Sequence, residues 1–262
     1  MLIIGERING MFKDVAKAIA GKDKQTIQKL AKAQIAEGAG MLDVNVGPAV
    51  PDALSAMQWL VETIQQVADV PLALDSTKPE AIEAGLRLVK HKAMINSTTA
   101  AKEKLEKLLP MAKQYKASLI GLTMGASGIP RDRHERSQFA AEIVSACIEA
   151  GISTADIYLD PIILPVNVTQ PQAIEVLESI REFKLLAQPS PKTVIGLSNV
   201  SQGTDLRSLI NRTFLVMATG AGLDAAIADP LDKDLIDAVI TAELLLNKHI
   251  YCASFLDAYR KK

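Results

Sequence analysis

The amino-acid sequence predicts a (β/α)8 barrel, a closed ring of eight parallel strands surrounded by helices. Short apolar runs alternate with longer helical patterns along all 262 residues, and eight such strand–helix units fit a chain of this length. The runs are rich in Val, Ile and Leu almost throughout, as is typical of parallel strands that are covered on both faces. The alternative, an open doubly wound sheet, would place a Gly-x-Gly-x-x-Gly loop after the first strand. Residues 5–10 read GERING instead.

The elements follow one another without a break in composition. We expect the strands, in chain order, at residues 2–8, 41–46, 70–75, 93–97, 118–124, 157–160, 193–198 and 223–228. Helical patterns lie between them, for example at residues 24–39, 52–68, 80–90 and 172–187. In the last of these, apolar residues recur at three- and four-residue spacing, as on one face of a helix. No linker or low-complexity tract divides the chain, so we expect a single domain over residues 1–262.

The longest irregular stretch, residues 124–136, contains two glycines and a proline. It follows the fifth expected strand, on the face where such barrels carry their active sites. We expect it to act as a mobile flap.

Charge and composition exclude several classes of partner. The 29 basic and 30 acidic side chains give a net charge of −1, so there is no basic patch for nucleic acid and no basic helix for a membrane surface. No stretch approaches the roughly 20 apolar residues of a membrane span, and Glu6 and Arg7 interrupt any signal peptide. Cys147 and Cys252 lie in apolar helical surroundings and are expected to be buried free thiols. The sequence therefore predicts a cytoplasmic protein.

Polar side chains stand at the end of one expected strand after another. The carboxyl ends of barrel strands meet at one face, so these side chains should form a ring around a ligand. The ring has neither histidine nor cysteine, which argues against a zinc site, and its acids come from strands too far apart for a convincing magnesium site. Its members are Glu6, Asn9, Asn45, Asp75, Asn96, Asp160, Ser198, Asn199 and Asp229.

Carboxylates and amides without a metal suit a flat heterocycle such as a pterin. An Asp that is ionised at neutral pH accepts hydrogen bonds from the 2-amino group and the neighbouring ring N–H, and Asn matches ring atoms that alternate donor and acceptor. Sugars and nucleobases use the same groups, so this pattern alone leaves the ligand open. Asp75 is equally placed to cap the next helix, whereas Pro161 favours a ligand-binding role for Asp160. We interpret Glu6 and Asp229 as structural.

The motifs themselves resemble those of the pterin-binding family, and in particular its methyltetrahydrofolate-dependent methyltransferases. The resemblance runs from residue 2 to about residue 250. The chain is similar both to enzymes that act with a corrinoid iron–sulfur protein in acetyl-CoA synthesis and to the folate module of cobalamin-dependent methionine synthase. The motifs are GERIN (5–9), LDVNVGP (42–48), LALDSTKPEAIEAGL (72–86), MINS (94–97), YLDPIILP (158–165) and TVIGLSNVSQG (193–203).

The resemblance implies a role for each of several residues. Asp75, Asn96 and Asp160 should hold the pterin ring, and Asn199 should donate a hydrogen bond toward N5, which carries the methyl group. Gly196 and Ser198 should line the same edge of the ring. Arg207 should lie near the pterin or aminobenzoate, and Asn45 and Gln202 are weaker assignments.

The resemblance also implies the reaction and the partners. Methyltetrahydrofolate is the substrate, and its N5-methyl group passes to the Co(I) centre of a corrinoid. The chain lacks the DxHxxG signature of cobalamin-binding proteins and any iron–sulfur cysteine cluster, so the corrinoid should be carried by a partner protein and the chain should bind no metal itself. A homodimer is expected from the resemblance alone.

Three other functions compete with this one. Dihydropteroate synthase is disfavoured, because the cationic residues that it needs are replaced by GLSNVSQG (196–203) and AAIADPLD (225–232). A methyltransferase subunit that uses methyltetrahydromethanopterin would share the ring contacts and remains open. A non-catalytic folate-binding subunit is disfavoured because ring binding alone needs no donor at N5.

Overall fold

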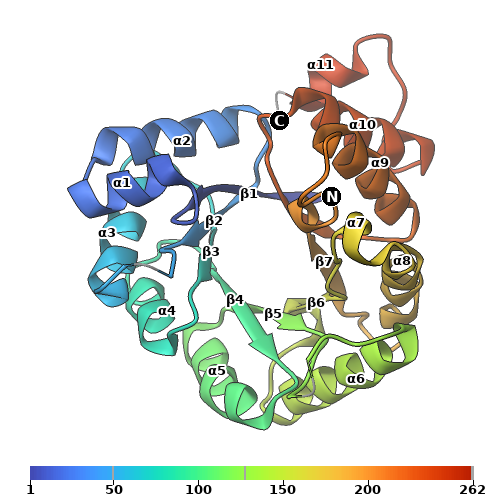
Figure 1. Ribbon diagram of the computed structural model, residues 1–262, viewed down its shortest axis with the longest axis horizontal. Coiled ribbons are helices and arrows are strands. Elements are labelled where there is room, and N and C mark those ends of the chain that lie inside the picture. The colour runs from blue at the N-terminus through green and yellow to red at the C-terminus, as the bar shows by residue number, and fades with distance from the viewer. Residues whose placement is uncertain (49, 127, 261–262) are drawn as a thin grey trace.

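The strands close into a single barrel in the computed structural model, which describes residues 1–48, 50–126 and 128–260. Within these residues the strand order around the barrel follows the chain, and each neighbouring pair is parallel (Figure 1). The (β/α)8 fold is therefore confirmed. The strands are β1 (Leu2–Asn9), β2 (Met41–Asn45), β3 (Leu72–Asp75), β4 (Met94–Thr99), β5 (Ser118–Leu122), β6 (Ile157–Asp160), β7 (Lys192–Gly196) and β8 (Ala225–Ala228).

Helices surround the barrel, and their apolar faces pack on its outer side (Figure 1). A pair of helices follows each of β1, β6 and β8, and short 3-10 turns precede β6 and follow β7. The helices are α1 (Lys13–Gly21), α2 (Lys24–Ala36), α3 (Ala53–Gln65), α4 (Pro79–Leu86), α5 (Lys102–Tyr115), α6 (Arg133–Glu149), α7 (Val166–Thr169), α8 (Gln172–Phe183), α9 (Arg207–Gly220), α10 (Lys233–Leu245) and α11 (Phe255–Arg260), with turns η1 (Thr154–Asp156) and η2 (Leu197–Asn199).

A layer of apolar side chains, one from each strand, fills the middle of the barrel. Its buried members form a cluster separate from the core under the helices, so the barrel is packed and not a pore. Successive side chains of a strand point to opposite sides, so the residue two positions later points into the barrel again. The layer consists of Ile4, Met41, Ala73, Met94, Ile120, Tyr158, Val194 and Ala225.

Several expectations about local structure are wrong. The seventh strand ends at Gly196, because residues 197–199 form the turn η2. The fifth strand ends at Leu122, because the chain turns back there and the Met124 N–H bonds the Leu122 carbonyl at 2.7 Å. Residues 133–136 of the expected flap form the first turn of α6; Ser127 in that stretch lies outside the described residues, and the flap's mobility stays a prediction. Cys147 is buried as expected, but Cys252 is exposed because it lies between α10 and α11.

A membrane span needs a helix that is both long and apolar. None of the helices in the described part of the chain meets both conditions.

Candidate functional site

Polar side chains occupy the layer above the apolar interior of the barrel. They stand two residues after members of the apolar layer and therefore on the same, inward side of their strands. The register sets Asn45 beside Asp75 and Asp75 beside Asn96. The inward positions are Glu6, Asp43, Asp75, Asn96, Asp160 and Gly196.

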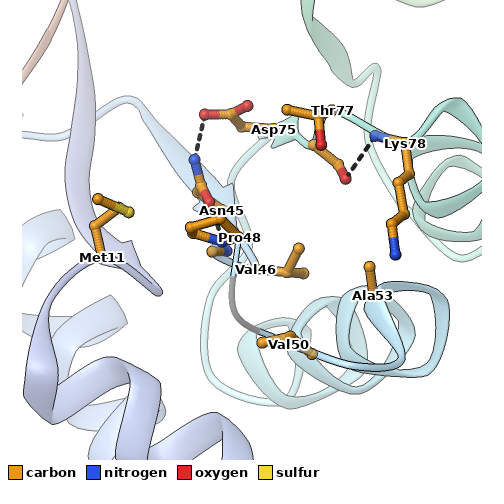
Figure 2. Close-up of a pocket in the computed structure, with 11 residues that line it drawn as sticks. Met11, Asn45, Val46, Pro48, Val50, Ala53, Asp75, Thr77 and Lys78 are labelled. Carbon is orange, nitrogen blue, oxygen red and sulfur yellow. Dashed lines mark hydrogen bonds between the residues drawn. The ribbon is translucent and has the colours of Figure 1, made fainter.

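Asp75 ends β3 and is held by its neighbour on β2. The Asn45 amide donates to Asp75 Oδ2 at 2.5 Å, and Asn45 Oδ1 accepts from the Gly47 N–H at 2.7 Å (Figure 2). Asp75 does not cap α4, because Lys78 occupies the N-cap position and no side chain makes a capping hydrogen bond there. The carboxylate is therefore oriented by an amide and caps no helix, whereas each polar atom of Asn45 already makes one hydrogen bond within the protein.

Asn96 and Asp43 form a buried pair across the barrel interior. Asn96 Nδ2 donates to Asp43 Oδ1 at 3.0 Å, which leaves the Asn96 carbonyl oxygen free to accept a hydrogen bond from a ligand. Asp43 is 3% exposed and had not been predicted as a site residue. Its position two residues before Asn45, within the run LDVNV, is the signal that could have found it, since both residues point into the barrel.

Asp160 ends β6 and is 8% exposed. Its carboxylate accepts hydrogen bonds from the backbone N–H groups of Ile162, at 2.7 Å, and of Gly196 on the neighbouring strand. Both donors belong to the backbone, so the carboxylate is oriented by the chain itself. Its remaining lone pairs are available to a ligand.

The segment after β7 contributes the other predicted residues. Ser198 Oγ donates to Glu6 Oε1 at 2.6 Å, which joins this segment to β1. Arg207 begins α9 and holds the segment from below, with Nε bonded to Ser201 Oγ and Nη2 to the Ser198 carbonyl, both at 3.2 Å. The Asn199 side chain is exposed and has no hydrogen-bond partner among the described residues. Asn199 is therefore an uncommitted amide donor at the rim of the barrel.

These residues divide between two cavities that share Met11. A cavity of about 130 Å³ holds Asn45 and Asp75 (Figure 2). A cavity of about 510 Å³ holds Ser198, Asn199, Gln202 and Arg207, and also Glu6 and Asp229. Asn96 and Asp160 line neither cavity, because both are almost completely buried.

Two residues interpreted as structural therefore face the larger cavity. Asp229 does keep a local role, since its Oδ1 accepts from the Leu231 N–H at 3.0 Å. Glu6 lies in the ring as expected, but it bonds the predicted site residue Ser198, so the structural interpretation misses its part in the site.

Burial raises the pKa values of the acids at the inward positions. Burial raises the pKa of Asp160 to about 7, and burial raises the pKa of Asp75 to about 6 despite the bond from Asn45. The pKa of Asp43 lies well above its usual range because of burial and the negative charge of Asp75. Burial also raises the pKa of Glu6. For Asp160 in the free protein, the expectation of full ionisation at neutral pH is therefore wrong, since water no longer solvates its charge, whereas Asp75 is still mostly ionised there.

Stability should therefore fall as the pH rises across this range. A native pKa above the unfolded value means that the folded protein binds the proton more tightly, so this stabilisation is complete below about pH 4 and is lost as the pH rises through 7. For Asp160 the loss is on the order of 4 kcal/mol. Urea denaturation between pH 4 and 8 should show a smaller fall in the free energy of unfolding for Asp160→Asn than for wild type. Parallel curves would contradict this assignment.

The chain resembles proteins that handle folates and corrinoids. Residues 10–229 match the family described as "Pterin binding enzyme". The chain is 29% identical to a protein named methylcorrinoid:tetrahydrofolate methyltransferase from Eubacterium limosum. The alignment covers the whole of this chain and 97% of that protein. It is 28% identical over 87% of its length to methionine synthase from Mycobacterium tuberculosis, of which it spans only 20%.

Solved structures of dihydropteroate synthase share the fold. The enzyme from Thermus thermophilus in complex with 6HMPPP superimposes with a TM-score of 0.69 at 16% identity, over 95% of this chain and 94% of that one. The Yersinia pestis enzyme with a sulfonamide drug gives 0.70 at 15% identity, again over 95% and 94%. At these identities the likeness concerns the fold alone. The family match, by contrast, covers most of the chain and includes every strand end that carries the polar ring except that of β1. This chain therefore belongs to the pterin-binding enzyme family.

Proposed function

We propose that this chain transfers a methyl group between N5 of methyltetrahydrofolate and the cobalt of a corrinoid carried by a separate protein. The observation that carries the proposal is the arrangement of Asp75, Asn96 and Asp160 in one inward polar layer, with the unpartnered Asn199 amide at the rim of the described barrel. The full-length similarity to a protein named methylcorrinoid:tetrahydrofolate methyltransferase supports it.

The acids and amides of the ring suit a pterin. The donor pair formed by the 2-amino group and the adjacent ring N–H meets an aspartate that is already fixed by its own hydrogen bonds, as Asp160 and Asp75 are. Asn96 offers its carbonyl oxygen, because Asp43 holds its amide nitrogen. Gly196, Ser198 and Gln202 stand on the same side of the barrel mouth, and Arg207 braces the loop that carries them.

Asn199 acts on the reacting nitrogen. The methyl group leaves N5 as the electron pair of Co(I) forms the new carbon–cobalt bond, and the electron pair of the broken carbon–nitrogen bond stays on N5 and takes up a proton. A donor aimed at N5 stabilises this developing charge more than it stabilises the ground state. Asn199 has no acidic proton, so the proton itself comes from solvent or a neighbouring carboxyl group.

The methyl-transfer site does not determine the direction of transfer, which depends on the partner protein. We propose transfer from methyltetrahydrofolate to Co(I), within the acetyl-CoA pathway, with a corrinoid iron–sulfur protein as partner and a cytoplasmic homodimer as the working form. The name of the E. limosum relative describes the opposite direction. The second candidate is therefore transfer from a methylcorrinoid to tetrahydrofolate. The same contacts serve both directions, because a reaction and its reverse share one transition state.

Carbon-13 labelling tests the proposal in both directions. Methyltetrahydrofolate labelled at the N5-methyl group is incubated with cob(I)alamin and the protein, and the methyl resonance should move to the position of a cobalt-bound methyl group. Labelled methylcobalamin and tetrahydrofolate should give the reverse. A label that stays in place in both mixtures, in protein that binds methyltetrahydrofolate, would reject the methyltransferase assignment.

A further inference from the structure

Arg136 is a completely buried arginine in the first turn of α6 and lies outside the ring described above. It is one of the largest side chains with no exposed surface. No carboxylate lies within ion-pair distance of its guanidinium among the described residues. A buried cation without such a partner is costly, so its presence calls for a reason other than stability.

The guanidinium binds the turn that follows β6. Arg136 Nε donates to the Pro161 carbonyl at 2.6 Å, and Nη2 lies 3.5 Å from the Ile162 carbonyl. Nη2 also donates to Gln172 Oε1 at 2.6 Å, and the Gln172 amide donates to the Arg131 carbonyl at 2.6 Å. One side chain thus connects the starts of α6 and α8 to the residues directly after Asp160.

That turn has an uncommon backbone conformation. Ile162 has a φ of 61°, which is unfavourable for a β-branched residue. Such a conformation persists only where the surrounding contacts impose it. The Ile162 N–H is the donor that orients the Asp160 carboxylate, so whatever fixes this turn also fixes that carboxylate.

The same arginine acts on Asp160 through its charge. The positive charge of Arg136 opposes the effect of burial and lowers the pKa of Asp160. Among the other acids near the guanidinium, Asp132 and Glu135 come from the start of α6 and Glu175 from α8. Arg136 Nη1 has no hydrogen-bond partner among the described residues, so part of the guanidinium is not used for structural bonds.

We propose that Arg136 is a positioning residue for pterin binding. It holds the Pro161–Ile162 turn so that the Asp160 carboxylate faces the pterin ring. The identity of the ligand rests on the function proposed above, whereas the geometry of the turn is independent of it. Arg136 contributes both a positive charge and a fork of hydrogen-bond donors, and different substitutions remove the two. Arg136→Gln removes the charge and most of the fork of donors, whereas Arg136→Lys keeps the charge and loses the fork.

Two readouts test the proposal, and one of them needs no ligand. Carbon-13 NMR of the Asp160 carboxyl group, assigned with Asp160→Asn, gives its titration midpoint in the free protein. Arg136→Gln should raise this midpoint and Arg136→Lys should largely restore it. Binding of methyltetrahydrofolate at pH 8, measured by calorimetry, should weaken about 10- to 100-fold in Arg136→Gln, as expected for a misplaced charge-assisted hydrogen bond. Arg136→Lys should recover only part of this loss, because the turn lacks its fork.

Arg133→Gln is the matched control, since Arg133 lies one turn earlier on α6 and its guanidinium pairs with the partly exposed Glu182. It should change neither readout. If Arg136→Gln does not fold, Gln172→Leu takes its place, since Gln172 is partly exposed and supports the arginine. A folded Gln172→Leu protein should bind about 3- to 10-fold more weakly.

The outcomes are distinct. An unchanged Asp160 midpoint and unchanged affinity in Arg136→Gln, or in Gln172→Leu where that variant replaces it, would overturn the positioning role. Failure of the wild-type protein to bind methyltetrahydrofolate would instead reject the proposed function and the pterin-binding part of this proposal, and the ligand-free titration would still show whether Arg136 acts on Asp160.

Discussion

Replacement of Asp160 by Asn should weaken the binding of methyltetrahydrofolate by about 100-fold, the largest effect on affinity that we expect from any single substitution. The carboxylate is held by two backbone N–H groups and leaves its other lone pairs for the pterin. An Asn side chain keeps the shape and one carbonyl oxygen, but its amide would face the ring donors with donors of its own. One charge-assisted pair is lost and a buried donor is left unpaired. Calorimetric titration at pH 8 measures the change.

The control for this substitution lies at the other end of β6. Asp156 precedes the strand, on the opposite side of the barrel, and forms an ion pair with Lys92. Asp156→Asn should leave the affinity for methyltetrahydrofolate within about twofold of wild type, since the residue is remote from the ring. Equal losses in the two variants would mean that Asp160 affects folding and not recognition.

Replacement of Asn199 by Ala should slow methyl transfer by about 10²- to 10³-fold and change the affinity for methyltetrahydrofolate by less than about threefold. The Asn199 amide has no hydrogen-bond partner in the described part of the protein, so its removal breaks no structural contact there. An interaction that forms at N5 only as charge develops there contributes to the rate and not to ground-state binding. Single-turnover measurements with saturating methyltetrahydrofolate and cob(I)alamin separate the two quantities.

Two further variants make the interpretation specific. Asn199→Asp keeps the size of the side chain and removes the donor, so it should be as slow as Asn199→Ala. Asn167→Ala removes another exposed amide, one that bonds the Gly203 carbonyl at 3.1 Å near the same loop, and should leave the rate within about threefold. If Asn199→Ala weakened binding and left the single-turnover rate unchanged, Asn199 would be a binding residue and the N5 role would be wrong.

The sequence predicted the barrel and the polar strand ends because both follow from local pattern. Each strand is a short apolar run, and a parallel sheet covered on both faces needs nothing more distinctive. Asp75, Asn96 and Asp160 close such runs, and the structure places all three on the inward side. Asp43 was not recognised because it lies inside an apolar run, whereas the prediction considered only the residues at the ends of such runs.

Other features depend on contacts between distant segments. The Ser198–Glu6 hydrogen bond joins residues at opposite ends of the chain, and no local pattern indicates it. Arg136 lies in the stretch predicted to be a flap, and only the closed barrel brings it against the turn after β6. The ionisation of Asp160 was likewise misjudged, because burial depends on how the strands and loops pack.

Stopped-flow absorbance tests the central claim most directly. Wild-type protein with bound methyltetrahydrofolate is mixed with cob(I)alamin under anaerobic conditions. The methyltransferase assignment predicts that the Co(I) band decays as the methylcobalamin band grows by the same amount, with a rate that increases with protein concentration and drops in Asn199→Ala. Decay at the protein-free rate, in protein shown to bind methyltetrahydrofolate, would contradict it and leave a pterin-binding barrel with a different methyl acceptor or none.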